Sequence, residues 1–544
     1  MRSEVLRLYK TIHSWTGIVS GMLLFVCFYA GALTVFAEPI GRWATPPARG
    51  AATIAGADEL IAATLAARPD AAKDFSLYLA ADGRPARLAW RKSREDAVRW
   101  MAYFSEAGEL RVERSHPSSI AAVVDAVHRT AGLPVGVEIG ENITGVLAGL
   151  YFVALVSGLI LVLPSLVRDV LALRLSANLK RMWLDAHNLV GVASLPFHLV
   201  IALTAFVFGL HDPIYAALDR MVYDGELPKI MRSTSPFAGV RRDEASAATK
   251  PVAELIAAVA ATSAGFTPKG LHYRDMHTRG ATVRVFGEDP RFLSRGGGFA
   301  ALRGATAEVV NVDYLPEAQS SWTKIVAAFF ALHFASYGGD IVRWTYLVLG
   351  LAGAFLFYSG NLLWIESRRR TARRHGEGVM QTRSTRLMAA ATVGVCLGCV
   401  CGLSVAIASV KWLHGHVDDI EVTSRAIYHA VAALALAFAF VRGAARAGAE
   451  LLGVAAVATA AIPAASAAAL VAPGLGPFAS ADPSGLCVDI VAAGAALGFA
   501  ALARAARRRS GAGPSDSVWS AVPASGTGAE GAPTESRATA PEPR

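Results

Sequence analysis

The chain has 544 residues, of which 53% are hydrophobic and only 17% are charged, and its formal net charge is +9. A soluble domain usually carries about 25% charged residues, so this composition argues against a soluble globular protein. The positive charge gathers at the ends of apolar runs, which is typical of membrane proteins and does not indicate a nucleic-acid partner.

Eight apolar runs are each long enough to cross a bilayer as a helix, which needs about 20 residues. They cover about 12–36, 143–164, 186–210, 340–364, 387–409, 425–442, 450–470 and 485–504. Basic residues such as Arg7, Arg168, Arg174 and Arg368 fall in every second connection. We therefore expect a multi-pass protein of a bacterial inner membrane with both termini in the cytoplasm, whose first run is a retained span rather than a cleaved signal.

Two long connections are each predicted to be a small α/β module on the periplasmic side. Both begin with the same helical string, at 59–63 and at 254–258, and then turn to short strands. Strands are predicted over 75–80, 86–91, 99–104 and 110–114 in the first module and over 282–286 and 308–314 in the second.

The predicted class is a mainly α, polytopic membrane protein with two α/β modules and a duplicated four-helix core. Its predicted division is span one over 1–36, module one over 37–142, spans two and three over 143–210, module two over 211–339, span four over 340–370, a C-terminal four-helix region over 371–509 and a disordered cytoplasmic tail over 510–544.

Histidines recur at matching places in the two halves of the core. His13 opens span one and His187 opens span three, each with a glycine four residues later, at Gly17 and Gly191. His128 precedes span two, and His333 precedes span four. The strings Ser157-Gly158 and Ser359-Gly360 then fall late in spans two and four. An approximate two-fold axis between the halves pairs His13 with His187 near the cytoplasm and His128 with His333 near the periplasm.

Each pair of imidazoles is predicted to hold the iron of one haem b from both faces, giving two haems. Two histidine ligands leave no open position on iron, which favours electron transfer over oxygen binding. Gly17 and Gly191 would let a porphyrin or a neighbouring helix approach closely. Cations at the ends of the spans would meet the haem propionates, and the candidates are Arg7, Arg181, Arg129 and Arg343.

His198 is a fifth candidate and keeps the assignment open. It lies 11 residues after His187, roughly 16 Å further along a continuous helix. It could replace one of the four ligands, serve a third site, or be a hydrogen-bonded core histidine. Cys396, Cys399 and Cys401 lie in an Ala/Gly-rich run, where small packing residues are a better interpretation than a metal motif.

The four-span core resembles the PepSY-associated transmembrane family over about residues 1–370. The strings that carry the resemblance are Ile12-His-Ser-Trp-Thr-Gly17, Val127-His-Arg129, Asp185-Ala-His-Asn-Leu-Val-Gly191, Leu195-Pro-Phe-His198 and Leu332-His333. The resemblance implies PepSY-like modules and a dihaem core with His13, His128, His187 and His333 as ligands. It also implies an iron-regulated inner-membrane protein, similar to reductases that release iron from ferric siderophores.

The expected function is therefore a haem-dependent oxidoreductase that passes electrons across the membrane to a ferric siderophore or other ferric chelate. No cytoplasmic segment is large enough for a flavin or nicotinamide domain, so the electron donor would be a quinol or a separate reductase. Two alternatives remain. The modules may serve a non-enzymatic binding or regulatory role, or the duplicated halves may form a siderophore or metal transporter.

Overall fold

The computed structural model describes residues 3–46, 56–80, 86–93, 99–105, 107–115, 119–165, 179–374, 382–472, 477–479, 483–512 and 517–521. Eight of its helices are long and apolar enough to cross a membrane, which confirms the predicted number and a multi-pass membrane protein. They are α1 (Ser3–Thr34), α5 (Val137–Val162), α8 (Leu195–Met221), α12 (Gly339–Arg374), α13 (Arg383–Leu413), α14 (Ile420–Arg442), α15 (Ala444–Val471) and α16 (Pro483–Ala512). Arg168 and Arg174, which helped to orient the chain, lie outside the described residues.

The apolar stretch predicted over 186–210 divides at Ser194. Helix α7 (Leu179–Ala193) carries His187, and α8 begins at Leu195. Pro196 lies in the first turn of α8, where its missing N–H leaves no helical hydrogen bond unmade. His187 and His198 therefore lie on two successive helices rather than on one continuous span.

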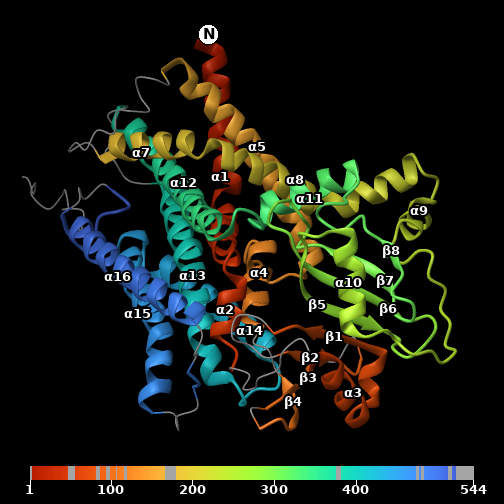
Figure 1. Ribbon diagram of the computed structural model, residues 1–544. Helices are drawn as coiled ribbons and strands as arrows, with labels where there is room; N and C mark the ends of the chain where they lie inside the picture. The colour runs from red at the N-terminus through yellow and green to blue at the C-terminus, as the bar shows by residue number, and fades with distance from the viewer. Residues whose placement is uncertain are drawn as a thin grey trace, which may run out of the picture.

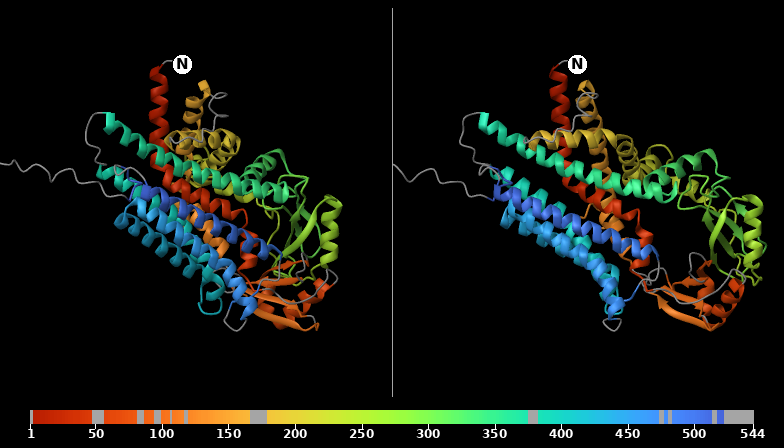
Figure 2. Two further views of the ribbon diagram at one scale, coloured as in Figure 1. Left: turned by 90° about the vertical axis from the view of Figure 1, so that its left-hand side faces the viewer. Right: turned by 60° about the vertical axis from the view of Figure 1, so that its left-hand side comes forward.

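The two predicted modules join into one antiparallel sheet, which lies at one end of the long helices (Figures 1 and 2). Its strand order is β4-β3-β2-β1-β5-β6-β7-β8, with β1 paired to β5 across the seam between the modules. The strands are β1 (Asp74–Tyr78), β2 (Arg87–Trp90), β3 (Arg99–Phe104), β4 (Leu110–Ser115), β5 (Thr267–Arg274), β6 (Thr282–Glu288), β7 (Phe299–Arg303) and β8 (Val309–Asn311).

Strands β5 and β7 were not predicted from the sequence. β5 contains Pro268 and Gly270, two residue types that are depleted in strands. The structure explains Gly270, because a Cβ there would collide with the carbonyl of Leu77 and the ring of Phe286. A glycine at this point permits the close approach of β1 and β5.

The order of elements repeats in the two halves of the core. Each half runs from a span to a helix that covers the sheet, then to four strands, a second helix and another span. The covering helices are α3 (Ala57–Ala67) and α10 (Val252–Thr262), and the second helices are α4 (Ile120–Arg129) and α11 (Ser321–Phe334). Short helices complete the described elements: α2 (Ala37–Trp43), η2 (Pro69–Lys73), η3 (Leu163–Ser165) and α9 (Leu227–Ser233). The sheet order is symmetric about its central seam, as expected of a duplicated core.

Helices α13 to α16 pack beside α1. Leu403 and Ala406 of α13 share a buried cluster with Val26 and Ala30 of α1. Cys396, Cys399 and Cys401 are free and buried, and Cys399 and Cys401 belong to clusters of apolar side chains that α13 forms with its neighbours.

A polar cluster ties these helices to the sheet end of the core. Lys411 is fully buried, its Nζ donates to Ser466 Oγ at 2.9 Å, and it lies 4.2 Å from the ring centre of Trp43 on α2. Trp43 Nε1 in turn donates to Asp489 at 2.8 Å. The start of α16 therefore lies near the sheet, and its C-terminal end points away from it.

The predicted tail begins with ordered residues. Helix α16 continues to Ala512, and Trp519 packs against a cluster that includes Ile365 and Ala389. The rest of the predicted disordered tail, 513–516 and 522–544, lies outside the described residues.

Candidate functional site

The structure brings the four matched histidines together as two pairs. His13 on α1 and His187 on α7 have ring centroids 6.4 Å apart with planes at 80°. His128 on α4 and His333 on α11 have centroids 6.2 Å apart with planes at 38°. We call the first the far pair, because it lies toward the ends of the helices opposite the sheet, and the second the sheet-side pair.

Both rings of the far pair are held by hydrogen bonds at Nδ1. His13 Nδ1 lies 2.9 Å from the carbonyl oxygen of Ala154 on α5. His187 Nδ1 lies 2.9 Å from Ser359 Oγ on α12. The Ser359 hydroxyl donates its proton to the carbonyl of Leu356 at 3.1 Å, so its oxygen accepts from the imidazole.

The sheet-side pair repeats this arrangement. His128 Nδ1 lies 2.8 Å from the carbonyl oxygen of Cys27 on α1. His333 Nδ1 lies 2.8 Å from Thr204 Oγ1 on α8. The Thr204 hydroxyl donates to the carbonyl of Val200 at 2.7 Å and therefore accepts from the ring.

These partners favour one tautomer for all four histidines. A backbone carbonyl can only accept, so the Nδ1 atoms of His13 and His128 carry the hydrogen. The hydroxyls of Ser359 and Thr204 each donate to a backbone carbonyl, which favours the same tautomer at His187 and His333. Each Nε2 is then left with a free lone pair, the form in which neutral imidazole binds a metal. Burial, with the neighbouring His128 as a second cause, also lowers the pKa of His333 to about 3, which keeps this ring neutral.

The spacing within each pair has room for one metal ion. A metal–imidazole bond is about 2.0 Å long and a ring nitrogen lies about 1 Å from its ring centre, so two imidazoles on opposite sides of a metal have centroids roughly 6 Å apart. The separations of 6.4 and 6.2 Å match this value. The described residues contain no group of three or more His, Cys, Asp or Glu that could hold a bare ion. A set of two imidazoles suits haem instead, since the porphyrin supplies the other ligands.

Glycines face three of the four rings, but they are not the expected ones. A Cβ at Gly158 would lie 2.9 Å from His13 Cε1, one at Gly31 would lie 2.8 Å from His128 Nδ1, and one at Gly360 would lie 3.6 Å from His187 Cε1. Among the described residues, a Cβ at Gly17 would meet nothing within 4 Å, and one at Gly191 would meet only Leu356 at 3.8 Å. None of the described helices therefore needs a glycine at Gly17 or Gly191 in order to pack there. The repeated Ser-Gly string was the sequence signal for two of the three glycines that do matter.

His198 belongs to neither pair. It is fully buried, and within the described part of the chain neither ring nitrogen has a hydrogen-bond partner. Its ring neighbours are Phe28 at 5.6 Å, Tyr151 at 6.0 Å and Phe197 at 5.2 Å. It precedes Thr204 by six residues, which places it about 9 Å along α8 from the contact with His333. It lies between the levels of the two pairs and cannot replace a ligand in either without a rearrangement.

Two of the four arginines expected near the propionates lie close to carboxylates. Arg129 is bound to Glu141 at 2.6 Å and to Asp125 at 3.4 Å, and Arg343 lies 3.5 Å from Asp340. Arg7 and Arg181 are exposed, and each lies six residues before a histidine of the far pair. On the sheet side, the two cations are already partly neutralised by carboxylates.

Comparison with known proteins supports a relationship over the core. The family model of the PepSY-associated TM region matches residues 10–367. The match contains all four paired histidines and the whole sheet, and it ends before α13. None of the curated proteins matches the chain.

Proposed function

The chain belongs to the PepSY-associated TM family, and from that premise we propose that it is a transmembrane b-type haem oxidoreductase that reduces a ferric chelate, such as a ferric siderophore, in the periplasm. The observation that supports the proposal is the pairing of four histidines whose Nδ1 atoms all have a hydrogen-bond partner. Their Nε2 atoms have no hydrogen-bond partner within the described part of the chain.

His13 with His187, and His128 with His333, would each hold one haem. Haem held by two imidazoles would supply a centre that gains and loses one electron. The chain's own contribution is to fix each ring. The acceptors at Nδ1 raise the basicity of the imidazoles and hold their orientation, so that each pair stays in place when the charge on the site changes.

The direction of transfer rests on the charge distribution. Arg7 near the start of α1, and Arg507 and Arg508 near the end of α16, lie at the ends of their helices that are remote from the sheet. By the positive-inside rule, that side would face the cytoplasm and the sheet would face the periplasm. The far pair would then face a quinol or a cytoplasmic reductase as electron donor, and the sheet-side pair would face a periplasmic substrate.

Reduction of the substrate would release its metal. Ferric ion is harder than ferrous ion and is held more firmly by oxygen donors, so one-electron reduction weakens an oxygen-donor chelate. The iron would then be free for uptake by another system.

An absorption spectrum of the purified full-length protein tests the proposal. We expect a reducible b-type signal with two haems per chain, and a dithionite-reduced sample that is reoxidised by a ferric chelate. His13→Ala and His333→Ala should each remove about half of the signal, since each deletes a ligand of one site only. A purified protein without haem, in which both variants behave as wild type, would favour a binding or regulatory role for the sheet instead.

A further inference from the structure

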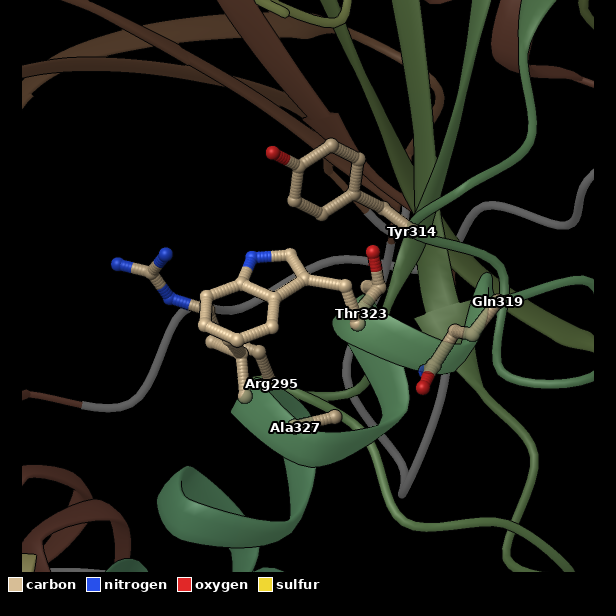
Figure 3. A pocket seen from close by; sticks show the side chains of 7 residues that line it. Arg295, Tyr314, Gln319, Thr323 and Ala327 are labelled. Carbon is tan, nitrogen blue, oxygen red and sulfur yellow. The ribbon is translucent and has the colours of Figure 1, made fainter. Parts of the chain in front are cut away.

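A small cavity lies where the sheet meets α11, on the helix that carries His333. Its volume is about 100 Å³, and its polar lining comes from Arg295, Tyr314, Gln319, Trp322 and Thr323. We call it the Arg295 pocket. Figure 3 shows Arg295 and Tyr314 reaching outward on the same side of the first turns of α11, with Gln319 at the start of the helix. The cavity is smaller than the roughly 300 Å³ of a site that encloses a whole ligand, so it can receive one group of a larger molecule.

Gln319 offers a buried acceptor that the protein does not use. Its side chain is 6% exposed, and Nε2 donates to the carbonyl of Leu293 at 3.2 Å. The other amide atom, Oε1, is buried and has no hydrogen-bond partner among the residues that the structure describes. Buried polar atoms are nearly always paired, so an unpaired acceptor that lines a cavity points to a donor group on a ligand.

Arg295 offers a cation without a carboxylate partner among the described residues. Its guanidinium lies 4.1 Å from the ring centre of Phe330, which leaves the edge of the planar group open. The nearby Asp289 and Glu317 are instead engaged by Arg291, at 2.7 and 3.6 Å. A guanidinium in this position can bind an anionic oxygen pair with two parallel hydrogen bonds.

Two aromatic side chains complete the recognition surface. Trp322 is 71% exposed, although the large apolar area of a tryptophan side chain usually favours its burial. Tyr314 stacks on Phe299 at 4.7 Å, which holds its phenol in place at the rim. An exposed indole beside a free guanidinium and a fixed phenol is suited to a flat, anionic, aromatic group.

The pocket is joined to the sheet-side pair by a chain of rings. Phe330, under Arg295, lies 4.8 Å from Phe208 and 5.8 Å from Phe334. Both of these rings lie 5.1 Å from His333. A molecule held by Arg295 is therefore connected to the proposed haem site by continuous aromatic contact, on the side proposed to face the periplasm.

We infer that the Arg295 pocket binds one anionic aromatic arm of a ferric chelate, a catecholate or an aryl carboxylate, and holds the iron beside the sheet-side pair. This inference rests on the proposed function for the electron it needs. One electron, derived from the quinol or reductase, reduces Fe(III) to Fe(II), and no covalent bond to the protein forms or breaks. Arg295 binds the anionic oxygens, Trp322 stacks on the ring, and Gln319 Oε1 accepts from a hydroxyl or amide N–H of the arm.

Binding of a gallium chelate tests the pocket without any electron transfer. Ga(III) has the charge of Fe(III) but is not reduced, so the gallium complex of 2,3-dihydroxybenzoate reports binding alone. Calorimetric titration of the full-length protein in nanodiscs of zwitterionic lipid should show saturable binding. Arg295→Gln, Trp322→Ala and Gln319→Leu should each weaken it by about tenfold or more, because each removes a charge-assisted hydrogen bond, a stacking face or an acceptor. Lys324→Gln is the matched control, since it removes a cation from the same helix outside the pocket lining and should leave the affinity unchanged.

The outcomes separate the pocket from the proposed function. Suppose that the haem spectra are intact but the gallium complex does not bind, or that Lys324→Gln weakens its binding as much as Arg295→Gln does. Either result would refute the proposed ligand site in the Arg295 pocket and would leave the proposed oxidoreductase function unaffected. If the purified protein contains no haem but binds the gallium complex through Arg295, the ligand site in the pocket is supported and the proposed oxidoreductase function is refuted. Anionic lipid presents a competing oxyanion. If Arg295→Gln alters only the retention of phosphatidylglycerol and not gallium-chelate binding, the pocket holds a lipid headgroup and the inference is wrong.

Discussion

The carbonyl oxygen of Cys27 accepts a hydrogen bond from Nδ1 of His128 at 2.8 Å. A ring on α4 is thereby fixed to the backbone of α1, the helix that also carries His13 of the other pair. Gly31 lies one turn further along α1 and leaves space for the same ring. One helix therefore contributes to both proposed haem sites, through a side chain at one and through its backbone at the other.

Gly31→Ala should selectively damage the sheet-side site. The added Cβ would lie 2.8 Å from His128 Nδ1, too close for an undisturbed ring. We expect a loss of about half of the haem, since only one site contacts Gly31. Pyridine haemochrome assay of the purified variant measures this. Gly498→Ala, at an open position on α16, serves as the control for membrane insertion and should keep both haems. Full haem content in Gly31→Ala would contradict the structure at this contact.

Double variants should reveal which histidines share a haem. His13→Ala combined with His187→Ala should lose no more haem than either alone, because both delete the same site. His13→Ala combined with His128→Ala should lose all of it. The ratio of Soret to protein absorbance distinguishes the two cases. Equal losses in both double variants would show that the pairing seen in the structure is not the ligation pattern.

His198→Phe should retain both haems. The histidine lies outside both pairs, in an aromatic environment that includes Phe28 and Phe197 and that suits a phenylalanine of similar size. The substitution also removes two buried nitrogens that have no partner, so thermal stability should be unchanged or slightly higher. Haem content and the melting temperature in detergent are the measurements. A loss of half of the haem would assign His198 as a ligand.

Thr204→Val should weaken haem binding at the sheet-side pair alone. The valine has the same shape but cannot accept the hydrogen bond from His333 Nδ1. Loss of such a supporting hydrogen bond typically costs about 10–100-fold in metal affinity. Transfer of haem to excess apomyoglobin, followed over time, should proceed faster for one of the two haems. Thr204→Ser keeps the hydroxyl and should behave as wild type; if it fails as badly as the valine variant, the hydrogen bond is not the cause.

Gly270→Ala should loosen the seam of the sheet. A Cβ at this position would collide with the carbonyl of Leu77 and the ring of Phe286. Forcing an extra carbon into such a contact typically costs about 1–3 kcal/mol. Hydrogen exchange should rise at the amides of both β1 and β5, which lie on opposite sides of the seam. Gly239→Ala, in open space, should leave exchange unchanged. Faster exchange confined to β5 would mean that the two halves of the sheet do not depend on each other.

The sequence was sufficient to predict the eight spans, the duplication and the partner of each histidine. The spans can be predicted because a helix needs about 20 consecutive apolar residues to cross a bilayer, and this condition depends on local composition alone. The pairs His13–His187 and His128–His333 can be predicted because the repeated order of motifs implies a symmetry axis between the two halves. Such an axis relates equivalent positions, so each pair follows without any knowledge of the contacts.

The tertiary structure alone decided how those rings are held and where His198 lies. Two of the four Nδ1 acceptors, at Ala154 and Cys27, are backbone carbonyls, which every residue carries, so no residue type could mark them. The joining of β1 to β5 is likewise a backbone pairing between strands nearly 200 residues apart. In addition, β5 contains Pro268 and Gly270, which are atypical of strands, so the sequence pattern did not predict it. His198 appeared equivalent to a ligand in sequence because it follows His187 closely. The break at Ser194 and the position of α8 place it instead between the two pairs, among rings that neither donate to it nor accept from it.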